Sequence, residues 1–185
     1  MYAETLKKYC DDLAARIPAP GGGSAAAACA ALAAALNSKV VNYTLGKPVY
    51  AKHEKELQGI LERSEKLRLE FLNLVDLDVV AFQSKDPRKA MDIPLMVCRL
   101  CYEGAKIYLP LAKKGNIKLI SDVAVATVVL EAAFSSSYYN VLINLKYIDD
   151  PKFAQKVKKE LQTKKRAMAR IRKVTEVYVG KIIGG

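Results

Sequence analysis

A proline- and glycine-rich segment, Pro18–Ser24, leads directly into the alanine-rich apolar segment Ala25–Ala35. Two prolines and three glycines end any preceding helix, and Ser24 then stands where an N-cap is expected, before residues that favour helix. Such a junction leaves backbone N–H groups at the positive end of a helix, with no side chains over them. It can hold an anion or the polar edge of a ring, or it can be a plain loop-to-helix junction with a packed alanine face.

Helical patterns extend over the rest of the chain, and no alternating apolar pattern with hairpin signals indicates a strand. Pro94 and Pro110 predict a kink or a split in the fourth helix, and Ser121 and Asp122 are expected to cap the fifth. The predicted fold is all-α, an antiparallel bundle of about six helices, two of them long, forming one domain over residues 1–185. The expected helices cover residues 2–16, 24–45, 50–84, 87–114, 122–145 and a last stretch from residue 151.

The chain carries a net charge of +11, and many of its lysines and arginines fall in the last expected helix, among apolar residues at helical spacing. This pattern predicts an amphipathic helix with a basic outer face. Such a face is usually solvated, but its field can attract a polyanion, either nucleic acid or a substrate with several carboxylates. No aromatic-basic stacking motif or zinc finger is present, so nucleic acid is not an expected partner.

The N-terminal residues do not have the layout of a signal peptide, because acidic residues interrupt their apolar pattern. The apolar segment Ala25–Leu36 is too short and too rich in small residues for a membrane span. We therefore expect a cytoplasmic protein without a membrane partner.

The four cysteines, Cys10, Cys29, Cys98 and Cys101, fit that compartment as buried thiols. Cys98 and Cys101 have the C-x-x-C spacing of a metal or redox pair. A zinc site would need two more ligands, and the single histidine, His53, is far away in the sequence. No metal site is therefore expected.

An antiparallel bundle brings distant parts of the sequence to one end. At about 1.5 Å per residue the second helix rises about 30 Å from Ser24, and the third returns to the level of Ser24 near residues 71–78. Asp76 and Asp78 are therefore expected beside the glycine-rich turn. Asn140 and Asn144 lie one turn apart on the fifth helix, roughly 27–33 Å from Asp122 and at the end where the glycine-rich turn is expected. We therefore expect carboxylates, two carboxamides and free backbone N–H groups to converge on one pocket, with Asp122 at the opposite end.

Four segments in order also carry a family resemblance. Ile17–Ser24 resembles the P-x-P-G-G-G-[SA] signature of the formiminotetrahydrofolate cyclodeaminase / methenyltetrahydrofolate cyclohydrolase family. Leu74–Phe82 is similar to the acidic helix segment of that family, and Asn140–Leu145 is similar to its N-V-x-I-N-L block. Residues 114–124 are similar to its glycine–asparagine turn and Ser-Asp cap. The resemblance covers most of the chain, from about residue 5 to about residue 160.

The resemblance implies a folate-handling, all-helical, dimer-forming enzyme without a metal or organic cofactor. In the cyclodeaminase reaction a side nitrogen of formiminotetrahydrofolate attacks the formimino carbon, ammonia leaves and methenyltetrahydrofolate forms. Some members instead add water to methenyltetrahydrofolate and give formyltetrahydrofolate. Both paths pass through a tetrahedral carbon between two nitrogens, and both need a group that removes and delivers protons. A partly desolvated carboxyl can do this.

The expected catalytic residues are Asp78, which the motif and the bundle geometry both favour, and Asp122, which the motif alone favours. Asp78 could instead be a surface aspartate or an ion-pair partner. Asp122 could instead cap its own helix, or it could complete the pocket of a second subunit. The expected substrate-binding residues belong to the glycine-rich turn and to the fifth helix: Pro20, Gly21, Gly22, Gly23, Ser24, Ser121, Asn140 and Asn144. The two asparagines could instead form hydrogen bonds between helices, and exposed lysines would favour a polyglutamate tail.

The connection after Phe82 departs from the family pattern. Family members continue through a longer stretch with an aromatic-basic-proline element, whereas residues 83–88 lead almost directly into the next helix here. If the missing stretch covers the substrate, this chain could act on a different folate or have lost the reaction. The alternative interpretation is therefore a non-catalytic helical dimer that binds a folate or an acidic partner.

Overall fold

The computed structural model describes residues 5–184, and within them every regular element is helical. The predicted all-α fold is confirmed. The first expected helix included residues 2–4, which lie outside the described residues. Short 3-10 turns at Pro48–His53, Ile117–Leu119 and Leu145–Tyr147 connect the longer elements. The α-helices are α1 (Leu6–Ala14), α2 (Gly22–Asn42), α3 (Glu54–Gln83), α4 (Pro87–Tyr108), α5 (Leu111–Lys114), α6 (Ile120–Asn144) and α7 (Pro151–Ile183).

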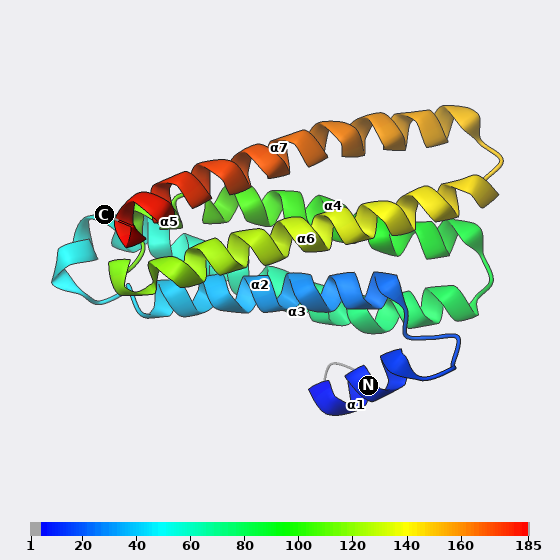
Figure 1. Ribbon diagram of the computed structural model, residues 1–185, viewed down its shortest axis with the longest axis horizontal. Coiled ribbons are helices and arrows are strands. Elements are labelled where there is room, and N and C mark those ends of the chain that lie inside the picture. Colours follow the sequence, from blue (N-terminus) through cyan, green and yellow to red (C-terminus); the bar gives the residue numbers. More distant parts are fainter. Residues whose placement is uncertain (1–4, 185) are drawn as a thin grey trace.

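The long helices lie side by side along the bundle, and α1 lies outside it, as Figure 1 shows. Consecutive long helices run antiparallel because their connections are short. The longest are α3, with 30 residues, and α7, with 33. The first turn of α2, the end of α3, the start of α4 and the end of α6 therefore lie at one end of the bundle.

Helix α2 is at the centre of the packing, in contact with α3, α4 and α6. Its alanines Ala27, Ala30, Ala33 and Ala34 are all fully buried, and such small side chains let neighbouring helices approach closely. Among the helices of residues 5–184, α2 alone is long and apolar enough to cross a membrane by length and composition. Most of that apolar stretch is buried inside the bundle, as in the core helix of a soluble protein.

The predicted starts of the fourth and the last helix, at residues 87 and 151, are confirmed. Asp86 accepts a hydrogen bond from the N–H of Arg88 at the start of α4, and Asp150 accepts one from the N–H of Phe153 at the start of α7. In both helices a proline occupies the first turn.

The caps predicted at Ser24 and at Ser121–Asp122 are wrong. The N-cap of α2 is Gly21, so Ser24 is already inside the first turn. The N-cap of α6 is Leu119, because Asn116 caps the preceding 3-10 turn and the chain continues from that turn into α6. In both cases the helix begins before the polar residue that the pattern favoured.

The two prolines of the fourth expected helix behave differently. Pro110 splits it, since α4 ends at Tyr108 and the short α5 begins at Leu111. Pro94 remains inside α4, where its missing N–H is compensated by a side chain of the candidate site described below.

The cysteines divide into two pairs. Cys98 and Cys101 are buried, and burial raises the pKa of the Cys98 thiol to about 12 and that of Cys101 well above its ordinary value. These are inert core thiols, as expected. Cys10 and Cys29 are exposed, contrary to expectation, because α1 lies outside the bundle and part of α2 faces solvent.

Candidate active site

The glycine-rich turn places the start of α2 directly against α3. The N–H groups of the first turn of α2 have no carbonyl acceptor within the helix. One of them, the N–H of Ser24, donates a hydrogen bond of 2.8 Å to Oδ2 of Asp78, near the end of α3. The predicted proximity of Asp78 to the glycine-rich turn is therefore confirmed.

The Ser24 side chain is fully buried and joins three helices. Its Oγ donates to the carbonyl oxygen of Val75 on α3 at 2.9 Å and lies 3.1 Å from the hydroxyl of Tyr9 on α1. The hydroxyl is thus used in helix packing, and only the backbone N–H of this residue reaches the Asp78 carboxylate.

Gly23 is required by the close approach of the Asp78 carboxylate. A Cβ built on Gly23 would lie 2.7 Å from Cγ of Asp78, which is closer than real Cβ atoms come. At Gly22 a Cβ would be in ordinary contact with the Asn140 carboxamide, 3.4 Å from its Oδ1, and at Gly21 it would meet nothing within 4 Å. Of the three consecutive glycines, only Gly23 therefore occupies a position where a side chain would collide with Asp78.

Burial raises the pKa of the Asp78 carboxyl above its ordinary value, because the ionised form loses water. The hydrogen bond from the Ser24 N–H lowers the pKa and is the smaller effect. Among residues 5–184, no lysine or arginine contributes to this pKa, so the ion-pair interpretation of Asp78 is not supported. A carboxyl with a raised pKa, held by one backbone N–H, is suited to accepting and returning a proton.

The Asn144 side chain compensates for a proline in the neighbouring helix. Pro94 has no N–H to donate to the carbonyl of Ala90, one turn earlier in α4. Asn144 Nδ2 donates to that carbonyl oxygen instead, at 2.8 Å, and so links α6 to α4. Asn140 Nδ2 donates to the Ser136 carbonyl of its own helix at 3.0 Å. Asn144 therefore forms the hydrogen bond between helices that the sequence left open as an alternative to substrate binding.

These groups enclose a cavity of about 230 Å³. An open groove of about 500 Å³ adjoins it and shares Pro18, Phe82, Ala90 and Asn144 with it. The groove lies along the short connection between α3 and α4, where Lys85 has a left-handed backbone with φ 56°. The residues that line the cavity are Pro18, Ala19, Gly21, Gly22, Gly23, Asp78, Phe82, Ala90, Asn140, Ile143 and Asn144.

Sequence reasoning missed the apolar walls of this cavity. Phe82 and Ile143 are about half exposed and lie within two of the motifs, but nothing in the motif pattern distinguishes a wall residue from a core residue. Ala90 lies outside the motifs and reaches the cavity because Asn144 holds its carbonyl. The available signal was that Phe82 and Ile143 are apolar residues within the motifs that the core of a helical bundle does not bury.

Four of the predicted site residues do not line this cavity. Pro20 and Ser24 are buried beside it, and Ser24 is connected to it only through the hydrogen bond from its N–H to Asp78. Ser121 and Asp122 lie at the opposite end of the bundle, with Asn140 roughly 27 Å further along the same helix. Oδ2 of Asp122 accepts a hydrogen bond of 2.8 Å from Lys39 Nζ in an exposed ion pair. Within one chain, Asp122 therefore does not meet Asp78.

The family model described as formiminotransferase-cyclodeaminase matches residues 5–85 and 84–163. The chain belongs to this family. The match is divided into two segments at residues 84–85, in the short connection between α3 and α4. The division coincides with the place where the sequence departs from the family pattern.

Named relatives fall into two groups by length. The methenyltetrahydrofolate cyclohydrolase of Methylorubrum extorquens is 37% identical over 182 residues, which cover 86% of this chain and 88% of the relative. The formimidoyltransferase-cyclodeaminase of Rattus norvegicus is 30% identical over 182 residues, which cover 86% of this chain but 34% of the relative. This chain therefore corresponds to about a third of that longer relative.

A solved structure has the same fold. The crystal structure of formiminotetrahydrofolate cyclodeaminase from Thermotoga maritima matches with a TM-score of 0.83 and 31% sequence identity. The match covers 98% of this chain and 96% of the other. The antiparallel helical architecture is therefore shared along nearly the whole length of both proteins.

Proposed function

We propose that this protein is a folate one-carbon enzyme with formiminotetrahydrofolate cyclodeaminase activity, and that the cavity beside Asp78 is its active site. The observation that carries the proposal is the half-buried carboxyl of Asp78, held by the Ser24 N–H beside two carboxamides. Family membership and the named relatives support a folate as substrate.

In this reaction the side nitrogen attacks the carbon of the protonated formimino group and forms a carbon–nitrogen bond. The tetrahedral carbon then loses its amino nitrogen as ammonia, and the methenyl compound remains. One proton moves from the attacking nitrogen to the leaving nitrogen. Asp78 takes that proton as a general base and returns it as a general acid, a role for which a raised pKa is favourable.

Hydration of methenyltetrahydrofolate is the second candidate activity, and the 37% identical cyclohydrolase relative favours it. Water adds to the methenyl cation, and Asp78 takes one proton from the water and delivers it to the ring nitrogen whose bond to the carbon breaks. The remaining hydroxyl proton is released to solvent as the formyl C=O forms. The product is formyltetrahydrofolate. The same cavity and the same carboxyl serve both reactions, because both pass through a carbon bonded to two nitrogens.

The remaining groups of the site would bind the substrate. Gly22, Gly23 and the carboxamides of Asn140 and Asn144 offer donors and acceptors for the polar edge of the pterin. The adjoining groove, with Phe82 and Tyr147 on its walls, would accept the rest of the folate, and the chain's net charge of +11 would attract a polyglutamate tail. We expect the enzyme to act in the cytoplasm and to need no metal or organic cofactor, so that activity survives dialysis against EDTA.

The direct test follows the absorbance of the methenyl compound. Asp78→Asn should lower kcat about 10²- to 10⁴-fold on the active substrate, because the proton shuttle is lost while the shape of the side chain is kept. Asp76→Asn is the matched control, two residues earlier on α3 and not in contact with the cavity, and it should keep normal rates. Formation of the methenyl compound identifies the cyclodeaminase and its consumption the cyclohydrolase. Equal rates for wild type and Asp78→Asn on both substrates would contradict the proposal.

We further propose that the enzyme is a homodimer whose subunits meet on the outer face of α2 and α6. These helices pack side by side (Figure 1), and their exposed residues on this face are uncharged over most of its length. Leu32 is 58% exposed, and Val125 and Tyr139 on α6 are 49% and 65% exposed. A two-fold axis across the middle of this face would bring Asp122 of one subunit to the glycine-rich turn of the other. Such a dimer would give Asp122 and Ser121 a place in the site.

Mixed dimers test this arrangement. Asp78→Asn and Asp122→Asn chains, each inactive alone under the proposal, are co-expressed with different tags and the mixed dimer is purified. If each site takes Asp78 from one subunit and Asp122 from the other, one of the two sites of the mixed dimer has both aspartates intact. About half of the wild-type activity should therefore return. No recovery, or a monomer by mass photometry, would contradict the shared site and leave the Asp78 assignment standing.

A further inference from the structure

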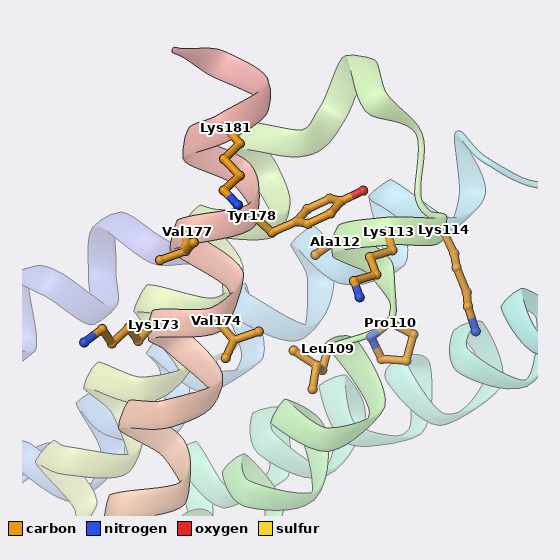
Figure 2. Close-up of a pocket in the computed structure, with 10 residues that line it drawn as sticks. All are labelled: Leu109, Pro110, Ala112, Lys113, Lys114, Lys173, Val174, Val177, Tyr178 and Lys181. Atoms are coloured by element: carbon orange, nitrogen blue, oxygen red, sulfur yellow. The ribbon is translucent and has the colours of Figure 1, made fainter. Parts of the chain in front are cut away.

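A second, larger pocket lies between the ends of α4 and α7, and the Asp78 site does not use it. Its volume is about 640 Å³, within the roughly 300–1,000 Å³ range of small-molecule sites. It exists because Pro110 ends the helical path of α4, while α7 continues past that point. Leu109 and Pro110 form one wall, and Val174 and Val177 form the other (Figure 2).

The walls are apolar and the rim is basic. Val174 and Val177 are each about half exposed, whereas Val157, Leu161 and Val179 of the same helix are buried. In Figure 2 Lys181 extends toward Tyr178 at the edge of the pocket and Lys113 extends into the pocket, with its Nζ 5.9 Å from the centre of the Tyr178 ring. The rim therefore combines two ammonium groups with an aromatic face.

The other two lysines of the pocket do not serve it in the same way. Lys114 is paired with Glu56 at 2.7 Å, and the Lys173 side chain extends away from the opposite wall in Figure 2. Within residues 5–184, no carboxylate lines the pocket to neutralise Lys113 and Lys181. A ligand with a negative charge would therefore complement the rim.

This pocket is separate from the Asp78 site. Ala90 of that site and Leu109 of this pocket lie on the same helix, roughly 28 Å apart at 1.5 Å per residue. The family match ends at residue 163, before the part of α7 that lines the pocket.

We propose that this pocket binds a small aromatic anion, with its ring between Val174, Val177 and Leu109 and its carboxylate or sulfonate at Lys113 and Lys181. The ring gains burial against the valine wall and the edge of Tyr178, and the anion gains two ammonium partners. A small molecule suits this pocket, because its volume of about 640 Å³ is in the range of small-molecule sites and its lining comes from two short stretches of the chain, residues 109–114 and 173–181.

Fluorescence titration with 1-anilinonaphthalene-8-sulfonate, a ring system with one sulfonate, tests the proposal on the whole chain. The double variant Lys113→Gln/Lys181→Gln should weaken binding about fivefold, as expected for two partly exposed charge contacts. Val177→Asp, which places a carboxylate on the wall, should weaken it about tenfold. The control Lys158→Gln/Lys159→Gln removes the same charge from an exposed part of α7 and should leave binding unchanged.

Competition then separates charge from simple hydrophobic adsorption. 2-Naphthoate should displace the dye at least fivefold better than neutral 2-naphthamide, while glutamate, which has no ring, should not displace it. Far-UV circular dichroism checks that each variant remains helical. No dye binding to the wild type, equal displacement by the acid and the amide, or equal weakening by the control double variant would each overturn the proposal.

Discussion

At one end of the bundle Asp78 lies against the first turn of α2, and at the other end Asp122 lies against Lys39. Asp78 is half-buried, has a backbone N–H as partner and has a raised pKa. Asp122 has a lysine as partner in an exposed ion pair, where water screens the interaction. Both aspartates belong to segments that resemble family motifs. What separates them is the environment, which prepares only Asp78 for proton transfer within one chain.

Within this comparison the largest effect is expected for a substitution that disrupts the close approach of the Asp78 carboxylate to Gly23. Gly23→Ala should lower kcat/KM about 100-fold, because the new methyl group would displace the Asp78 carboxylate by about 1 Å. Gly21→Ala is the control from the same turn, where a Cβ meets nothing within 4 Å. Steady-state kinetics of both variants measure the difference. If Gly23→Ala were as active as Gly21→Ala, the position of Asp78 would not matter for the reaction.

The pH dependence of activity sharpens the comparison. Ionised Asp78 is the form that accepts a proton, so kcat/KM should rise with pH through the raised pKa of Asp78. The acidic limb should therefore lie above the ordinary aspartate pKa of about 3.9. In Asp122→Asn the acidic limb should keep the same midpoint pH, even where the overall rate is lower. In Asp78→Asn the remaining activity should show no such limb. A limb that survives in Asp78→Asn would assign it to another group.

The same shift predicts the pH dependence of stability. A carboxyl whose pKa is raised on folding binds its proton more tightly in the folded state, so ionisation costs stability. Relative to Asp78→Asn, the wild type should lose stability as the pH rises from about 3.9, the unfolded value, through the raised folded pKa. Urea midpoints of the two proteins at several pH values measure this difference. A difference that does not change with pH would contradict the raised pKa.

Smaller effects are expected for the two serines in the first turns of α2 and α6, at the two ends of the bundle. Ser24→Ala should cost about 1–2 kcal/mol of unfolding free energy, because the buried hydroxyl bonds to Val75 and Tyr9. Ser121→Ala removes an exposed hydroxyl from the first turn of α6 and should leave the urea midpoint unchanged. Equal midpoints for the two variants would show that the Ser24 hydroxyl does not join the helices.

The smallest effect is expected for the ion pair at the Asp122 end. Lys39→Ala should leave the stability of the isolated subunit unchanged within repeated urea titrations, because exposed ion pairs contribute little. A clear loss of stability that appears only at concentrations where dimers form would instead place Lys39 at the interface between subunits.

The sequence was a good guide to which segments meet, because helix length and chain reversal are regular. A rise of 1.5 Å per residue was enough to bring Asp78, Asn140 and Asn144 to the glycine-rich turn. It was a poorer guide to the helix starts, since Ser24 and Ser121 both lie inside helices that begin earlier. Capping patterns are local, whereas the starts of α2 and α6 follow from the loop and the 3-10 turn before them.

The sequence by itself determined the all-helical fold, the family and the end of the bundle where the candidate site lies, because these depend on periodicity, motif order and helix rise. Only the tertiary structure decided that the Ser24 N–H holds Asp78, that Gly23 leaves room for the carboxylate, and that Asn144 supplies the hydrogen bond that Pro94 cannot. These are contacts of a few ångströms between helices far apart in the chain. They depend on how the helices are rotated and packed, and no local pattern of residues records that.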